Sequence, residues 1–181
     1  KALKRQKQLG FLAEKNNDLT VMAHAYRSAI KYGTNSAFSS PDEYIKLTEA
    51  LSRQISSNNE TSSIKIINEA EAVFEQLDKS FSVNSIDRLR SSVAHAAFCQ
   101  SSKEEEKQQK YLNNIEKQLQ QINEQIPPEI SLQLSKSLKK LGKSDLADDI
   151  LDNAIQQNID DIEFIKNASQ ITSNSELIKN S

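Results

Sequence analysis

Residues 141–147 read Leu141-Gly142-Lys143-Ser144-Asp145-Leu146-Ala147, and Leu151 and Ala154 follow shortly after them. Glycine takes the left-handed conformation that ends a helix more readily than other residues, so Gly142 predicts a helix end and a short turn. Ala147, Leu151 and Ala154 recur at helical spacing and therefore share one face of the helix that begins after the turn. Because two of these residues are small, the pattern predicts two antiparallel helices that approach closely along this face.

A weaker copy of this pattern lies near the start of the chain. It consists of Leu9, Gly10, Ala13, Asn17, Asp18, Leu19, Met22, Tyr26 and Ala29. Repeated helix pairs are typical of a solenoid, because each pair buries its apolar face against its neighbours in the stack. Such an array presents a broad surface and no obvious catalytic pocket, so the repeat favours a binding function over an enzymatic one.

The composition favours helices throughout the chain. The 181 residues include only three Gly and three Pro, and 36% of them are hydrophobic. Scarce helix breakers favour long helices over hairpin-rich sheet, so we predict an all-α fold. Apolar residues at spacings of three and four place the helices at about 1–16, 19–32, 41–55, 61–79, 86–100, 102–124, 130–141, 145–157 and 162–171. A polar stretch at 56–59 is expected to separate the third helix from the fourth.

Cap residues support several of these boundaries. Ser40 and Glu43 have the spacing of a capping box at the start of the third helix, and Ser102 and Glu105 repeat that spacing at the start of the sixth. Gly33 is expected to end the second helix in the left-handed conformation.

The last complete helix pair resembles the tetratricopeptide repeat (TPR) family. The positions that match the family signature, in order, are Leu134, Ser135, Leu138, Gly142, Ala147, Leu151 and Ala154. A second set of matching positions is Leu9, Gly10, Ala13, Tyr26 and Ala29. The middle of the chain departs from the pattern, because residues 44–77 lack the tight Gly-containing turn and residues 89–122 keep only the first helix convincingly.

This resemblance implies a right-handed α-solenoid of about four TPR-like antiparallel helix pairs plus a terminal helix. The units would cover about 1–33, 40–79, 84–124 and 129–158, with the terminal helix at 161–172, in a single repeat domain over 1–181. Because the chain begins with Lys1 rather than Met, we expect it to be a fragment of a longer protein.

A narrower resemblance is to bacterial response regulators that carry a receiver domain ahead of degenerate TPR units. The runs that carry it are His-Ala-Tyr-Arg-Ser-Ala-Ile-Lys-Tyr-Gly at 24–33 and Ser-Pro-Asp-Glu-Tyr-Ile-Lys-Leu at 40–47. The resemblance implies the output or adaptor part of a bacterial two-component signalling protein in the cytoplasm. No phosphoacceptor aspartate is assigned, because both runs match the helical output half of such proteins.

In the TPR family the first helices of successive units line a concave groove, which here would bind a peptide or helix of a partner protein. The residues that the resemblance places in this groove are Lys4, Lys7, Phe11, Asp42, Glu49, Arg88, His95, Phe98, Lys136 and Lys139. Phe11 and Phe98 are apolar where a solvated helix face carries polar residues, so we expect them to anchor the partner. The expected function is a non-catalytic protein–protein interaction scaffold.

Other functions lack their sequence signals. A net charge of −2 gives no general attraction for nucleic acid or anionic lipid, and no apolar run is long enough to span a bilayer. His95 and Cys99 are spaced like two metal ligands on a helix, but no motif supplies the remaining ligands. A single cysteine also fits a reducing compartment such as the cytoplasm. We therefore expect no catalytic residues, no cofactor and no metal.

The alternative function is a helical oligomerisation module. Helix 102–125 carries a thin apolar seam that could pair with its copy in a homodimer. The seam consists of Tyr111, Leu112, Ile115, Leu119 and Ile122.

Overall fold

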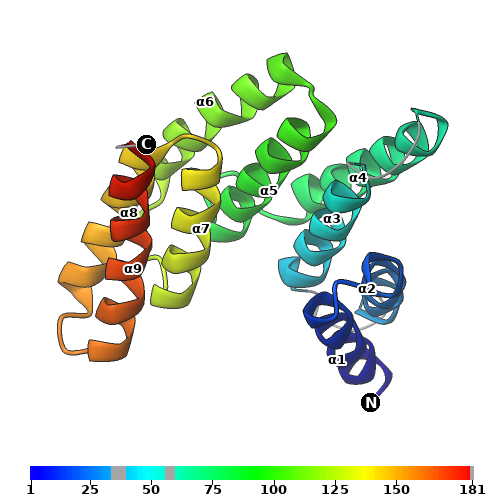
Figure 1. The fold of residues 1–181 in the computed structure, drawn as a ribbon, viewed down its shortest axis with the longest axis horizontal. Coiled ribbons are helices and arrows are strands. Elements are labelled where there is room, and N and C mark those ends of the chain that lie inside the picture. The colour runs from blue at the N-terminus through cyan, green and yellow to red at the C-terminus, as the bar shows by residue number, and fades with distance from the viewer. Residues whose placement is uncertain (34–39, 56–59, 180–181) are drawn as a thin grey trace. The chain divides into compact units, whose positions relative to one another are not determined.

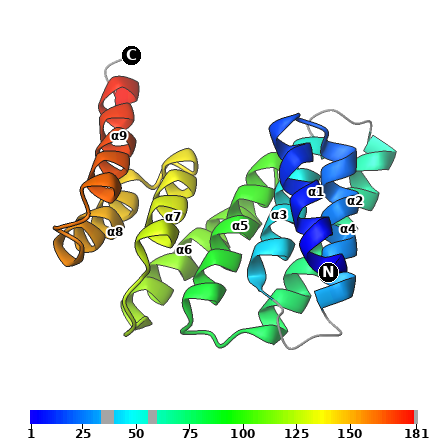
Figure 2. The same ribbon diagram turned by 90° about the horizontal axis from the view of Figure 1, so that it is seen from below.

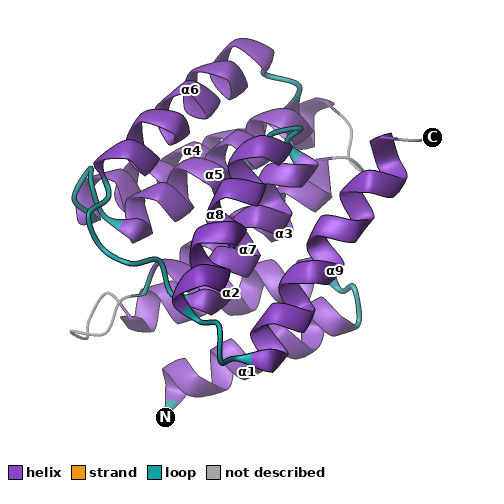
Figure 3. Ribbon diagram, turned by 90° about the vertical axis from the view of Figure 1, so that its left-hand side faces the viewer, coloured by secondary structure: helices purple, strands orange, loops and turns teal. Residues whose placement is uncertain are grey.

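The protein is represented by a computed structural model that describes the backbone of residues 1–33, 40–55 and 60–179. Over these residues it consists of α-helices and connecting loops without a strand, as Figure 3 shows, and the all-α prediction is confirmed. The helices are α1 (Ala2–Lys15), α2 (Leu19–Gly33), α3 (Pro41–Ile55), α4 (Glu60–Ser80), α5 (Ile86–Ser102), α6 (Glu105–Gln121), α7 (Pro128–Lys140), α8 (Ser144–Gln157) and α9 (Ile162–Lys179).

Each of these helices coincides with one that the apolar spacing predicts, with shifts at the ends (Figure 1). The largest shift is in α9, which continues past the predicted end at 171 to Lys179. The expected break at 56–59 lies outside the described residues. No helix in the described part of the chain is long and apolar enough to cross a bilayer.

The chain divides into two compact units, Lys1–Leu112 and Asn113–Ser181. The first unit contains α1 to α5 and the N-terminal half of α6, and the second contains the rest of α6 and α7 to α9. The boundary lies inside α6. Whether the chain is the single repeat domain expected from the sequence stays a prediction.

In the first unit, successive helices pack against each other from α1 to α5, and α3 also packs directly on α5. The pairs α1–α2 and α3–α4 lie side by side in Figure 2. The helices of this unit enclose one core. Its large side chains are Met22, Tyr26, Tyr44, Leu47, Leu51, Phe74, Leu77 and Phe98. Each helix contributes one apolar stripe, which explains why helical spacing located these elements.

The first pair, α1–α2, depends on a glycine. A Cβ atom added to Gly10 would lie 2.7 Å from two ring atoms of Tyr26, closer than packed atoms approach. Tyr26 is itself buried in the core, so its ring has little room to move away. Asp18 begins α2 as a cap, because its Oδ1 accepts a hydrogen bond from the Val21 amide at 3.0 Å.

In the second unit, α7 packs on α8, and α9 packs on both. Gly142 has a φ of 75°, the left-handed conformation predicted for the turn. Ala147 is buried where α8 meets α7, and the Ser135 hydroxyl of α7 donates to its carbonyl at 3.0 Å. Ala154 is buried in a cluster with Phe164, Ala168 and Ile171 of α9. The close approach predicted from small residues is therefore present.

Three cap predictions need correction or completion. Ser102 belongs to the last turn of α5, where its hydroxyl donates to the Phe98 carbonyl at 3.1 Å, so it does not begin α6. Gly33 ends α2 without a left-handed φ. Ser40 does accept a hydrogen bond from the Asp42 amide at 3.2 Å, but the Glu43 carboxylate forms an ion pair with Lys7 of α1.

We predict that Gly10→Ala destabilises the protein. Alanine gains about 1 kcal/mol in helix propensity over glycine, whereas overpacking a tight core costs about 1–3 kcal/mol. The expected net change is a loss of roughly 1 kcal/mol in the free energy of unfolding, measured by urea denaturation. Gln8→Ala, on the exposed side of the same helix, is the matched control.

The second variant Gly10→Ala/Tyr26→Leu removes the ring that causes the clash. In the Tyr26→Leu background, adding Gly10→Ala should be neutral or stabilising. An equal loss in both backgrounds would show that the Gly10–Tyr26 contact is not the cause.

Candidate functional site

The groove residues predicted from the sequence lie on α1, α3 and α5 of the first unit and on α7 of the second. They differ sharply in accessibility. Phe11 is 52% exposed, whereas Phe98 and His95 are 1% and 3% exposed. Lys4 and Lys136 are also exposed, and the remaining charged residues lie in ion pairs described below. The set is therefore not one continuous surface.

Phe98 is part of the core of the first unit and cannot contact a bound peptide. Its ring packs edge-on against Phe74 with 5.9 Å between centroids. The expectation that Phe98 anchors a partner is therefore wrong. The same holds for His95 as a surface residue, because its ring is enclosed by α4 and α6 side chains.

Charged side chains predicted for the groove tie neighbouring helices together. Lys46 of α3 lies 2.9 Å from Glu14 of α1 and 2.9 Å from Glu49 on its own helix. Asp42 of α3 pairs with Arg90 of α5. Burial opposes the ionisation of Asp42, but the hydrogen bond and positive charge of Arg90 outweigh it and hold the pKa of Asp42 below its usual value. These carboxylates are stabilised by partners inside the chain.

Two further predicted residues serve the same purpose. Arg88 of α5 lies 3.1 Å from the Asp78 carboxylate of α4. In the second unit, Lys139 of α7 pairs with Asp148 of α8 at 2.8 Å and donates to the Ile171 carbonyl of α9 at 3.2 Å. Lys139 thus connects three helices and is itself largely covered.

The outer side of α1 is the clearest unoccupied apolar surface of the first unit. Leu9 is 41% exposed and Leu12 is 55% exposed, beside Phe11. Leu9 belongs to the apolar pattern predicted for this helix, together with the buried Gly10 and Ala13, but Leu9 itself is exposed. The Lys15 ammonium lies 4.6 Å from the centre of the Phe11 ring, within range of a cation–π interaction.

Basic residues surround this apolar strip. Lys1, Lys4, Arg5 and Lys15 are all exposed and fall on the same side of α1 as Leu12, by helical spacing. All of α1 is described, and its one acidic residue, Glu14, is the half-buried partner of Lys46. The resulting face is apolar and positively charged. The sequence contains a signal for this face. Leu12 lies four residues after Gln8 and three residues before Lys15, so helical spacing places it among polar residues on one side of α1.

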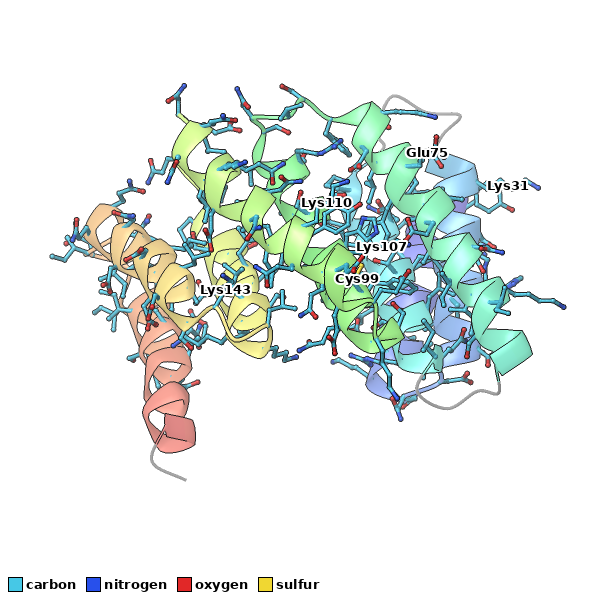
Figure 4. The ribbon with its side chains drawn as sticks, turned by 90° about the horizontal axis from the view of Figure 1, so that it is seen from above. Lys31, Glu75, Cys99, Lys107, Lys110 and Lys143 are labelled. Atoms are coloured by element: carbon cyan, nitrogen blue, oxygen red, sulfur yellow. The ribbon has the colours of Figure 1, made fainter. Side chains whose placement is uncertain are left out.

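A polar cluster centred on the buried His95 lies between α4, α5 and the first half of α6. The His95 ring is stacked between Phe74 and Tyr111, with centroid distances of 3.9 Å and 3.8 Å. Its Nε2 atom lies 3.4 Å from a Glu71 oxygen, which also lies 3.3 Å from the Lys107 ammonium. Figure 4 shows Lys107 beside the buried Cys99. Helical spacing in the sequence does not predict that Glu71, Lys107 and Tyr111 lie near His95, because these residues belong to other helices.

The electrostatics of this cluster suit a structural role. Burial lowers the pKa of His95, although attraction to Glu71 opposes this, so the neutral ring is favoured. Burial also raises the pKa of Cys99 to about 12 and that of Tyr111 to about 12. A thiol that stays protonated at neutral pH is a poor nucleophile. Among the described residues, no three His, Cys, Asp or Glu side chains gather as metal ligands would.

The seam proposed for self-pairing of α6 is largely covered in the structure. Leu112 and Ile115 are buried, and Leu119 and Ile122 are half-buried. Within the second unit, Glu116 of this helix pairs with Lys143 at 2.9 Å. A coiled-coil seam has to be exposed to meet its copy. These observations do not favour pairing through helix 102–125.

A shallow cleft with a volume of about 450 Å³ lies in the second unit. Its apolar wall includes Leu119, Ile122 and Ile150, and its polar residues include Asp149 and Asn153. Ser131 also lines the cleft, and its hydroxyl donates a hydrogen bond to the Pro127 carbonyl at 3.2 Å.

No family model, no curated protein and no solved structure matches this chain.

We predict that His95 makes the stability of the protein depend on pH. The unfolded chain binds a proton at His95 near pH 6.5, whereas the folded chain resists it because the pKa is lowered. The contribution of neutral His95 is therefore fully present above about pH 6.5 and is lost as the pH falls from there through the folded pKa. The loss is at most about 1.4 kcal/mol per pH unit.

Urea unfolding between about pH 8 and pH 5 measures this dependence. His95→Gln should flatten the slope near pH 6.5, because glutamine does not titrate. The exposed His24 provides the matched control, His24→Gln. Equal slopes in the wild type and His95→Gln would contradict the assignment.

Proposed function

We propose that this chain is a non-catalytic protein–protein interaction scaffold, built as a right-handed α-solenoid of TPR-like helix pairs. Support for the stacked arrangement comes from the packing order within each unit. Antiparallel pairs form at α1–α2, α3–α4 and α7–α8, and α3 contacts both the helix before it and the first helix of the next pair, α5. This is the neighbour-to-neighbour burial on which a repeat array depends.

The observation that carries the binding function is the exposed apolar strip of α1. Three large side chains, Leu9, Phe11 and Leu12, project from a helix whose opposite face is buried in the core. Clustered exposed apolar residues with a polar rim mark interaction sites more often than scattered ones do. Burying them in a complex is favourable at roughly 25 cal/mol per Å² of apolar surface. We name Phe11 as the anchor and assign no such role to Phe98.

Among the other groove residues, Lys4 and Lys136 provide exposed positive charge for a partner. Such charges raise the association rate and orient the partner more than they add affinity. Lys7, Asp42, Arg88 and Lys139 hold helices together in the free chain, and Glu49 pairs with Lys46 on its own helix. Their contribution to binding is indirect, because they keep the first helices in place.

The narrower part of the proposal is an output or adaptor role in a bacterial signalling protein of the cytoplasm. It is supported by the two runs at 24–33 and 40–47, which occupy α2 and the start of α3. The buried His95 ring and Cys99 thiol pack together with the half-buried Tyr111, which suits the non-catalytic role that we propose.

We expect Phe11→Ala to weaken peptide binding by about tenfold or more, as removal of a central aromatic anchor does. Peptides are first selected from a random library on the immobilised wild-type chain, and their affinities are then measured by fluorescence anisotropy. Ile64→Ala, an exposed apolar side chain on α4, is the control and should leave binding unchanged. Peptides that bind both variants and the wild type equally well would place the binding surface elsewhere.

A further inference from the structure

A second exposed apolar surface lies at the turn between α8 and α9. Ile159 is 71% exposed and Ile162 is 81% exposed, more than any other large apolar side chain in the described part of the chain. Asp160, Asp161 and Glu163 are exposed around them. The segment from Gln157 to Ile162 also lines a shallow surface hollow. We call the residues 159–163 the turn surface.

The α1 face described above, which we call the α1 surface, has the opposite charge. It consists of Lys1, Lys4, Arg5, Leu9, Phe11, Leu12 and Lys15. Residues 1–13 contain no acidic residue, whereas residues 144–165 contain no Lys or Arg and seven acidic residues. The overall net charge of −2 therefore hides two regions of opposite sign. Both regions expose large apolar side chains at their centres.

We propose that the α1 surface of one copy of this chain binds the turn surface of a second copy, so that copies associate head to tail. The inference rests on the proposed function, because it names the partner of the same α1 surface. Apolar side chains meet apolar side chains in this arrangement, and lysines and arginine meet aspartates and a glutamate.

Charge also decides between the ways in which two copies can meet. A symmetric contact between two α1 surfaces would place two sets of four basic side chains against each other, without a carboxylate between them. A symmetric contact between two turn surfaces would do the same with acidic side chains. Like charges across an interface oppose association, so the head-to-tail contact is favoured. Such a contact leaves one free surface of each kind on every dimer and extends to longer assemblies or closes into a ring.

Two substitutions separate the surfaces without disturbing the fold. Leu12→Glu places a good helix former at an exposed position of α1 and reverses the character of the α1 surface. Ile162→Asp lies in the first turn of α9, where a negative charge favours the helix. We avoid Asp161, because its Oδ1 accepts from the Phe164 amide at 2.9 Å and caps α9.

Sedimentation velocity on the purified chain at low ionic strength tests the proposal. The wild type should associate as its concentration rises, and each single variant alone should stay monomeric. An equal mixture of the two variants should form a dimer that grows no further, because it unites the one intact α1 surface with the one intact turn surface. The variant carrying both substitutions should not associate with itself. Ile64→Ala should behave as the wild type does.

Association should weaken by roughly tenfold when the salt concentration rises from about 50 mM to 500 mM, because exposed charges are then screened. A wild-type chain that stays monomeric over the whole concentration range would overturn the inference. So would single variants that still associate, or a mixture that does not restore the dimer. The scaffold function is tested separately by the library peptides. If Phe11→Ala binds these peptides as well as the wild type does, the scaffold function is contradicted whatever the sedimentation results show.

Discussion

Close approach of helices at small residues is the constraint on which this structure depends. Gly10 leaves the space that the Tyr26 ring occupies, and Ala147 lets α7 come near enough for the Ser135 hydroxyl to reach its carbonyl. The chain has a modest share of hydrophobic residues, so each helix carries only a narrow apolar stripe. Dispersion attraction falls steeply with separation, and narrow stripes stabilise the fold only when the helices that bear them are in close contact.

Local patterns in the sequence were enough to locate the helices, and they were not enough to assign the faces of those helices. The turn at Gly142 depends on residues within one or two turns of helix, and its φ of 75° agrees with the prediction. Phe98 shows the limit. The repeat signature does not specify whether the residue at this position faces solvent or a neighbouring helix. Phe98 is buried because α4 packs against α5 and places Phe74 beside it. Leu9 shows the converse, because it belongs to the predicted apolar pattern of α1 but is exposed.

Most predicted groove charges have partners within the chain. Asp42, for example, was predicted to face a ligand in the groove. In the structure its carboxylate instead forms an ion pair with Arg90 of the next first helix. The sequence does not distinguish these two uses, because the partner lies 48 residues away and its position depends on the fold. The His95 cluster is hidden for the same reason, since its members come from three helices. What remains accessible is an apolar, basic α1 and an acidic, apolar turn before α9.

Helix α6 belongs to both compact units, since the boundary between Leu112 and Asn113 falls in its middle. Severing the chain there would leave four carbonyls before the cut and four amides after it without intrahelical partners. A shorter fragment that ends before α6 would remove Tyr111 and open one side of the His95 ring to water. Anyone who wishes to express either half in isolation therefore has to clone α6 whole with it.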